Sequence, residues 1–524
     1  MYIKKRTSRV VLEYGQAEVR TEAGMLRGVI SDGTYIFRGI EYAEAERFHL
    51  PRKVTPWTGV KEAIVYGNAC PEHYTVIPHD QYTVPHYFTV QSEDCQYLNV
   101  WTQHLNTTAR RPVMVWFHGG GMMTGSGVEH YAYDGEDASR YSDVVVVTLN
   151  HRLNVLGFLD LSDYGEEYKY SGVAGIADLV AALEWVRDNI RNFGGDPDNV
   201  MIFGQSGGGS KVVSMLQSPA AAGLFKRAVL QSGGMRRGGE MTPEKSKKLA
   251  SYVVEELGLT KETIKEIETV WYDRLAEAAI KASKRLQEET GERVMFGPVV
   301  GDYYYGHPFQ HGFRPETKDV EVMCGNVFGE FKQNFNRPLG EGVKNSWSEA
   351  YAEEVIRGEL GDSADAVMAA FKKAYPDKKV QDCLFMDESM RRGALDFARL
   401  RAEFTDAPVY NFLFTLESPF NGGTLPWHNA EIPYTLHNAA YLEPSYLPGV
   451  TEKLQDVIAR AWANFAAKGD PNGDPVPEWP RFEKDRNVTM IFDKEIRIGC
   501  DHDKELVEVY PERAINMSKL MDRR

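Results

Sequence analysis

Residues 201–210 read MIFGQSGGGS, a short apolar run that leads into a serine surrounded by glycines. The segment GQSGG (204–208) fits the Gly-x-Ser-x-Gly pattern of a sharp strand-to-helix turn. Glycines suit such a turn because a neighbouring Cβ would clash with the strained backbone around the serine. The helix that follows offers free N–H groups in its first turn, and these favour negative charge. The segment therefore predicts that Ser206 is a nucleophile; a plain glycine turn is the alternative.

Apolar, β-branched runs recur along the chain and predict buried strands. Their apolarity is continuous rather than alternating, which is typical of strands covered on both faces. They occur at 112–121, 143–151, 199–206, 227–234, 319–326, 408–416 and 488–492. Between them, residues 175–193 carry apolar side chains at helical spacing. This alternation of strands and helices predicts an α/β fold with a mostly parallel sheet.

The domain organisation is predicted from composition. Residues 240–320 and 335–405 are rich in Lys, Glu and Ala and indicate helical insertions. The turn-rich stretch 468–480 is a loop rather than a domain boundary, because another strand-like run follows it. We therefore expect one large domain over residues 1–524 with these two insertions.

Charge and composition exclude several classes of protein. The 524 residues include 60 basic and 75 acidic side chains, a net charge of −15, which disfavours nucleic acid or an anionic membrane as partner. We find no secretory signal pattern and no uninterrupted apolar run that could span a bilayer. The expectation is a cytoplasmic protein, with secretion by another route left open. Five cysteines are too few for a disulfide scaffold, no spacing suggests zinc, and no cofactor is expected.

A second glycine-rich loop, FHGGGMMTG (117–125), also follows a predicted strand. When a serine attacks an ester, the carbonyl oxygen becomes an oxyanion, and backbone N–H groups must already point at it. Losing one such donor raises the barrier by about 2.7–4 kcal/mol in a well-studied case. A flexible turn or a phosphate cradle is the alternative, but no Gly-Lys-Ser/Thr follows, so a P-loop is not supported. Together with the serine turn, the loop predicts an oxyanion site.

These segments resemble blocks of the type B carboxylesterase/cholinesterase family of α/β hydrolases, in its para-nitrobenzyl-esterase-like form. The resemblance covers nearly the whole chain and keeps the family order. Further matching blocks are EDCQYLNVW (93–101), NHRLNVLGFL (150–159), ALEWVRDNIRNFGGDPDNVMIFGQSGGG (182–209) and WANFAAKGDPN (462–472). The resemblance implies the α/β-hydrolase fold: a central, mostly parallel sheet flanked by helices, with helical insertions that form a gorge. It also implies hydrolysis of carboxylic esters.

The resemblance also implies a catalytic triad. The family acid is a glutamate five residues after a strand-ending glycine, which selects Glu330 in CGNVFGEF, although a nearby aspartate remains an alternative. The family histidine lies three residues before the glutamate of EIPY (431–434), which selects His428, with His437 as the alternative. Ser206, Glu330 and His428 follow the chain order of α/β hydrolases. In these roles His428 moves the proton of Ser206, and Glu330 orients the imidazole.

Supporting residues follow from the same resemblance. The oxyanion donors are the backbone amides of Gly120, Gly121 and Gly207. Ser232, in LQSGG, matches a family serine that supports the triad by hydrogen bonding; an ordinary strand-end serine is the alternative.

The chain departs from the family pattern beside the predicted site. Gln205 stands where the family usually has glutamate, which argues against choline esters as substrates. Met122 replaces the usual phenylalanine after the glycines, and Phe331 replaces the glycine after the acid. We expect Gln205, Met122, Phe328 and Trp427 to line the substrate pocket.

Family members close a disulfide loop in the region of residues 72–90. The resemblance therefore implies that Cys70 and Cys95 pair and that this stretch lies near the gorge mouth. Two free thiols in a reducing compartment are the alternative.

The preferred interpretation is a serine hydrolase that cleaves uncharged esters of small or medium acyl chains through an acyl-enzyme. Its partner is a small-molecule ester, and the sequence does not specify an oligomeric state. Amide or carbamate hydrolysis with the same triad is an alternative. A non-catalytic binding protein is another, but such proteins usually lose a triad member.

Overall fold

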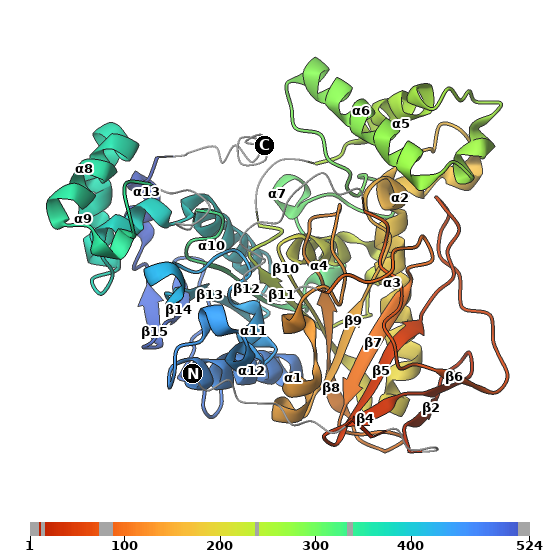
Figure 1. Ribbon diagram of the computed structural model, residues 1–524, viewed down its shortest axis with the longest axis horizontal. Helices are drawn as coiled ribbons and strands as arrows, with labels where there is room; N and C mark the ends of the chain where they lie inside the picture. The colour runs from red at the N-terminus through yellow and green to blue at the C-terminus, as the bar shows by residue number, and fades with distance from the viewer. Residues whose placement is uncertain (1–9, 12–15, 73–86, 236–239, 333–338, 512–524) are drawn as a thin grey trace.

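The computed structural model describes residues 10–11, 16–72, 87–235, 240–332 and 339–511 (Figure 1). Its centre is a twelve-stranded sheet. In spatial order the strands are β1 (Val10–Val11), β4 (Val29–Ser31), β5 (Thr34–Glu41), β7 (Tyr97–Thr102), β9 (Val145–Leu149), β8 (Arg111–Phe117), β10 (Gly195–Gln205), β11 (Arg227–Gln231), β12 (Glu321–Val327), β13 (Val409–Phe414), β14 (Val488–Phe492) and β15 (Arg497–Cys500). A small second sheet holds β2 (Glu18–Arg20), β3 (Met25–Arg27) and β6 (Val60–Glu62).

The middle of the large sheet is parallel and its two flanks are antiparallel. Every neighbouring pair from β9 to β14 in the spatial order is parallel. The strands from β1 to β7, and β15 at the other edge, pair antiparallel with their neighbours. The predicted mostly parallel α/β sheet is therefore confirmed.

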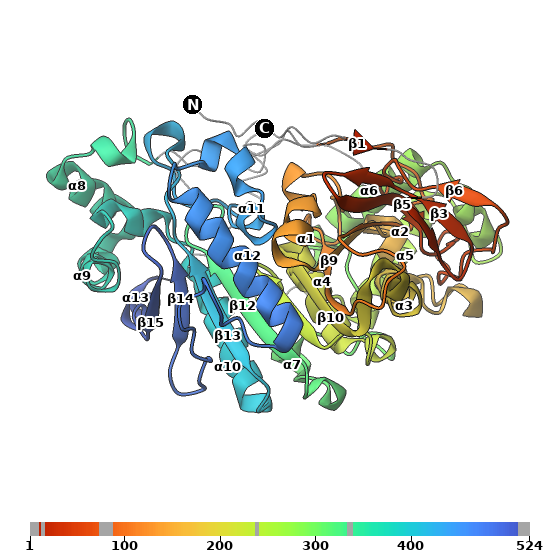
Figure 2. The same cartoon turned by 90° about the horizontal axis from the view of Figure 1, so that it is seen from below.

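Helices cover both faces of the sheet. Successive side chains of each strand point to opposite faces, so each strand contributes to two cores. On β8, Val113 and Val115 enter one apolar core and Met114 and Trp116 enter another. The first core also takes side chains from α3 (Ala174–Asn189), α4 (Gly207–Gln217) and α10 (Glu388–Phe404). The second takes side chains from α1 (Glu136–Ser142) and α12 (Thr451–Lys468), and Figure 2 shows α12 running along this face.

Both segments predicted as insertions contain helices. The first holds α5 (Pro243–Glu256), α6 (Tyr272–Thr290) and α7 (Pro308–His311), and the second holds α8 (Glu349–Leu360) and α9 (Ala364–Ala374) before α10. The α5–α6 pair and the α8–α9 pair lie on opposite sides of the molecule (Figure 1). The remaining α-helices are α2 (Asn154–Phe158), α11 (Ile432–Thr435) and α13 (Lys504–Val509). Within the described ranges, no helix combines the length and apolarity needed to cross a bilayer.

The sequence pattern missed the strands of the N-terminal region, which form the antiparallel edge of the large sheet and the small second sheet. β2, β3, β4 and β6 are only three residues long, too short to show a hydrophobic period. β10 also starts earlier than predicted, because Gly195 already pairs with Arg111 before the register shifts ahead of Val200.

The parallel register places several strand ends at one edge of the sheet. β8 ends at Phe117, β10 at Gln205 and β12 at Val327, and each is followed by a predicted site loop. Ligands of open α/β sheets bind outside the carboxyl ends of the strands. The fold therefore brings the two glycine-rich loops and the Glu330 loop together.

We predict that Gly208→Ala destabilises the protein by about 1–3 kcal/mol, the usual cost of overpacking. A Cβ at this position would overlap the backbone carbonyl oxygen of Phe117. The matched control is Gly358→Ala in α8, where a Cβ meets nothing within 4 Å. That control should stabilise the helix by about 0.5–1 kcal/mol. Urea denaturation measures both, and similar effects of the two substitutions would contradict the packing described for the serine turn.

Candidate active site

Ser206 stands at the junction of β10 and α4, in a backbone conformation that few residues adopt. Its φ is 57° and its ψ is −121°, and it caps the N-terminus of α4. A positive φ outside glycine is uncommon and marks a strained position that the surrounding structure must hold. The Ser206 amide donates to the carbonyl oxygen of Gln231 at 2.8 Å, which ties the turn to β11.

A hydrogen-bonded chain of three side chains starts at Ser206. The Nε2 atom of His428 lies 2.7 Å from the Ser206 Oγ. The Nδ1 atom of the same ring is hydrogen-bonded to Oε2 of Glu330. Glu330 is fully buried, and its Oε1 accepts a hydrogen bond from the amide of Val327 at 3.0 Å. In this arrangement a carboxylate orients an imidazole that can take the serine proton.

Backbone contacts hold the two loops that carry Glu330 and His428. Glu330 has a φ of 46° and forms an isolated parallel bridge with Trp427. The amide of Gly329 donates to the carbonyl oxygen of Pro426 at 3.1 Å. These contacts fix the distance between the carboxylate and the imidazole.

The oxyanion loop lies directly against the serine turn. Gly120 and Gly121 have φ values of 82° and 66°, a region that favours glycine. The Gly121 backbone approaches Gly207 so closely that a Cβ on Gly207 would overlap it. Among the described residues, none accepts a hydrogen bond from the amides of Gly120, Gly121 or Gly207. The three N–H groups predicted to bind an oxyanion are therefore neighbours that donate to none of the described residues.

The alternative histidine lies away from the triad, and the supporting serine lies beside the acid. His437 lies elsewhere: its Nε2 is 2.7 Å from Asp456, and its ring stacks on Tyr141 at 3.9 Å between centroids. The Ser232 Oγ accepts from the Val327 amide at 3.3 Å, the same N–H that donates to Glu330. Ser232 is thus next to the acid and shares its hydrogen-bond donor.

The four side chains predicted to line the pocket are all buried. Phe328 is 1% exposed and packs edge-to-face on Tyr375, and Trp427 is 2% exposed in the core under α12. Met122 packs in the core on the α3 and α4 face. Gln205 is also buried, and its side-chain amide donates to the main-chain carbonyl of His428. It therefore holds the histidine loop, which an ionised glutamate could not do by donating a hydrogen bond.

Phe331 is the aromatic residue that reaches the site instead of Phe328. Its half-buried ring lies 4.0 Å from the imidazole of His428, centroid to centroid, with a tilt of 35°. One sequence signal pointed to Phe331, the replacement of the family glycine after the acid. Phe328 enters the core cluster formed with α8 and α9, whereas Phe331 follows the turn at Glu330.

The predicted disulfide is not formed, since Cys70 and Cys95 are both free thiols in the described chain. Both are buried in the core on the α3 and α4 face. A hydrogen bond between the Cys95 thiol and Cys70, together with burial, raises the pKa of Cys95 well above its usual value. Most of the stretch 72–90, expected at the gorge mouth, lies outside the described residues.

A buried polar network behind the serine escaped the sequence analysis. The side-chain amide of Gln231 donates to Oε1 of Glu431 at 3.1 Å and accepts from the indole N–H of Trp462 at 3.2 Å. Burial, with a further contribution from the negative charge of Glu330, raises the pKa of Glu431 to about 8. Glu431 is therefore a neutral acid at pH 7 and adds no second charge beside the triad.

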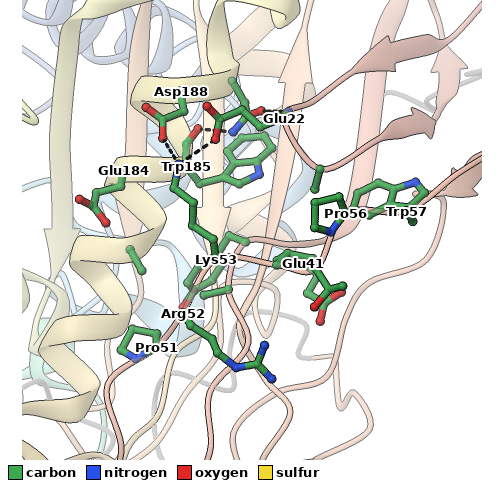
Figure 3. Close-up of a pocket in the computed structure, with 17 residues that line it drawn as sticks. Glu22, Glu41, Pro51, Arg52, Lys53, Pro56, Trp57, Glu184, Trp185 and Asp188 are labelled. Atoms are coloured by element: carbon green, nitrogen blue, oxygen red, sulfur yellow. Dashed lines mark hydrogen bonds and ion pairs between the residues drawn. The ribbon is translucent and has the colours of Figure 1, made fainter.

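A separate groove of about 570 Å³ lies beside α3 (Figure 3). Its lining includes Lys53, whose Nζ lies 2.9 Å from Glu22 and 3.1 Å from Asp188. None of its lining residues belongs to the serine site. Lys53 is thus paired with two carboxylates, and the groove lies apart from the serine site.

The chain is similar to known carboxylic ester hydrolases. The sequence profile of the carboxylesterase family matches residues 15–506, so the chain belongs to the carboxylesterase family. It is 31% identical over 500 residues to the para-nitrobenzyl esterase of Bacillus subtilis, covering 93% of this chain and 97% of that protein. It is 32% identical over 496 residues to the phenmedipham hydrolase of Pseudarthrobacter oxydans, covering 91% and 94%.

A solved structure of an esterase from anaerobic Clostridium hathewayi is also similar. It superposes with a TM-score of 0.90 at 42% identity, covering 96% of this chain and 99% of that one. That esterase is described as able to hydrolyse aliphatic aromatic polyesters. The chain is thus a carboxylic ester hydrolase with the α/β-hydrolase fold, in a family that acts on small-molecule esters.

The raised pKa of Glu431 gives a prediction about pH and stability. The folded state keeps this proton up to about pH 8, whereas the unfolded chain releases it near 4.5. Stability should therefore fall as the pH rises from about 4.5 to about 8, by at most about 1.4 kcal/mol per pH unit from this group. Glu431→Gln can still accept from Gln231 and should flatten the fall of the melting temperature over this window. If the melting temperatures of the variant and the wild type fall in parallel as the pH rises, Glu431 is ionised in the folded protein.

Proposed function

We propose that the protein hydrolyses uncharged carboxylic esters of small or medium acyl chains through an acyl-enzyme on Ser206. The observation that carries the proposal is the hydrogen-bonded chain Ser206–His428–Glu330 at the carboxyl edge of the sheet. The neighbouring amides of Gly120, Gly121 and Gly207 support the same proposal.

The first half-reaction forms the acyl-enzyme. The Ser206 Oγ attacks the ester carbonyl carbon while Nε2 of His428, at 2.7 Å, takes the hydroxyl proton. Glu330 stabilises the resulting imidazolium through Nδ1. The carbonyl oxygen becomes an oxyanion and accepts from the amides of Gly120, Gly121 and Gly207. When the carbonyl re-forms, the alkoxide leaves with the proton from His428.

The second half-reaction releases the acid. A water molecule takes the place of the alcohol, gives its proton to His428 and attacks the acyl carbon. The same amides bind the second oxyanion, and Ser206 leaves with the proton returned by the imidazole. Every proton thus passes through the one ring that Glu330, Gln205 and Phe331 hold in place.

Neutral esters are favoured because the residue before the nucleophile is uncharged. Gln205 places an amide, not a carboxylate, beside Ser206, so no negative charge there attracts a cationic alcohol group. Phe331 adds an apolar ring next to the imidazole. An ester with an aliphatic or aromatic acyl group fits these surroundings.

The test is release of p-nitrophenol from a ladder of esters, acetyl to dodecanoyl, with a benzoyl ester as an aromatic rung. We expect activity with an optimum at one chain length, and a loss of more than about 10⁴-fold in Ser206→Ala. The matched control is Ser251→Ala, an exposed serine on α5, which should keep wild-type activity. Activity that persists in Ser206→Ala would contradict the proposal. So would folded wild-type protein that cleaves none of these esters.

A further inference from the structure

A fully buried lysine lies beneath the oxyanion loop. Lys211 is 0% exposed, and its Nζ is 2.9 Å from the carbonyl oxygen of His118 and 3.4 Å from that of Gly119. A lysine is almost never fully buried without partners. Its two carbonyl acceptors belong to the residues that immediately precede Gly120.

Helix α4 brings this amine to the loop. Ser206 caps the helix, and Lys211 follows on its second turn. Side chains on a helix tilt toward its N-terminus, so a long side chain at this position runs back toward the turn that carries Ser206. One rigid element therefore carries both the serine and the amine that contacts the glycine loop.

A contact that orients the carbonyl of one residue also orients the N–H of the next residue. Because the bond is planar and trans, the C=O of one residue and the N–H of the next point in opposite directions. Holding the Gly119 carbonyl on the Lys211 side therefore directs the Gly120 N–H to the other side. The Nδ1 atom of His118 lies 2.9 Å from the same carbonyl, and since a carbonyl oxygen only accepts, Nδ1 must donate.

The backbone of Gly119, unlike the amide of Gly120, has a side-chain hydrogen-bond partner among the described residues. The Gly119 backbone is hydrogen-bonded to the Tyr133 hydroxyl, which is in turn hydrogen-bonded to the side chain of Glu129. The Gly120 carbonyl accepts from the amide of Thr124 at 3.0 Å, and this bond directs the Gly121 N–H. The peptide between Gly119 and Gly120 thus depends on Lys211 and His118.

The Lys211 amine can donate to both carbonyl oxygens in either protonation state. Burial lowers the pKa of Lys211 to about 7, against the negative charges of Glu129 and Glu72. Burial beside Glu72 raises the pKa of Glu129 to about 8. The pKa of His118 is well below its usual value, because of burial and the nearby Lys211 charge. Whether protonated or neutral, the amine has at least two N–H groups, enough for the two carbonyls.

We propose that Lys211 is a positioning residue of the oxyanion hole: through the carbonyls of His118 and Gly119 it fixes the Gly120 amide toward the developing oxyanion. This inference rests on the proposed acyl-enzyme function. Lys211 itself does not touch the substrate. Its contribution is to the transition state, because the Gly120 amide binds the oxygen most strongly when the oxygen is charged.

The test compares Lys211→Met with Lys344→Met. Methionine keeps a linear side chain but has no donor. Lys344 is also 0% exposed, and its Nζ lies 2.8 Å from Asp382 and 2.7 Å from Glu417, so it controls for the loss of a buried amine. Both variants should lower the melting temperature. We expect kcat to fall about 10- to 100-fold only in Lys211→Met, less than the loss of a whole oxyanion donor, with KM within about twofold of wild type.

A second readout separates positioning from structure. A trifluoromethyl ketone reacts with Ser206 so that Oγ bonds to the carbonyl carbon, the serine proton moves to His428, and the ketone oxygen becomes an oxyanion. The corresponding secondary alcohol has no carbonyl and forms no oxyanion. In Lys211→Met the inhibition constant of the ketone should rise by the factor by which kcat/KM falls, while that of the alcohol stays unchanged.

Each outcome decides the question. Equal losses of ketone and alcohol affinity, or equal kcat values in Lys211→Met and Lys344→Met, would overturn the proposal. Lys211→Gln keeps an N–H donor and should recover part of kcat, and it carries the comparison if Lys211→Met does not fold. Failure of both Lys211 variants to fold would also count against it, because Lys211 would then act on the whole fold. Activity in Ser206→Ala would instead refute the acyl-enzyme function itself.

Discussion

The tight turn between β10 and α4 is the constraint on which the rest of the site depends. Ser206 has a positive φ, and its turn is packed so closely that the carbonyl oxygens of Phe117 and Ser206 leave no room for a Cβ at Gly208 or Gly233. This packing requires β8, β10 and β11 in parallel register, so the position of one hydroxyl depends on the centre of the sheet. The large α/β core thus serves as the rigid support of a strained serine.

Around that turn, each functional group is fixed by a contact that belongs to another loop. Gln205 holds the backbone of His428, the Glu330 carboxylate joins the imidazole to the end of β12, and Lys211 reaches from α4 to the glycine loop. Such preorganisation matters because donors that are already in place need no rearrangement when charge develops. Burial and the charge of Glu330 raise the pKa of Glu431 to about 8, which favours a neutral Glu431 beside the Glu330 carboxylate at pH 7.

The sequence predicted most of the parallel sheet and the serine turn, because both depend on local patterns. Glu330 and His428 came only from family resemblance, since nothing local links residues that meet across 98 positions. Phe328 and Phe331 flank the same turn, and only the three-dimensional structure distinguishes the core ring from the one on His428. Lys211 escaped notice because a lysine in a helix normally lies at the surface.

The central claim is that Ser206 forms the covalent intermediate, and mapping that intermediate tests it most directly. The protein would be mixed with p-nitrophenyl butyrate, quenched in acid within the first turnovers, digested and analysed by mass spectrometry. The account predicts a butyryl group on the peptide that contains Ser206, and no such group in Ser206→Ala. A butyryl group on another side chain in the quenched wild type, lost when that residue is replaced, would contradict it.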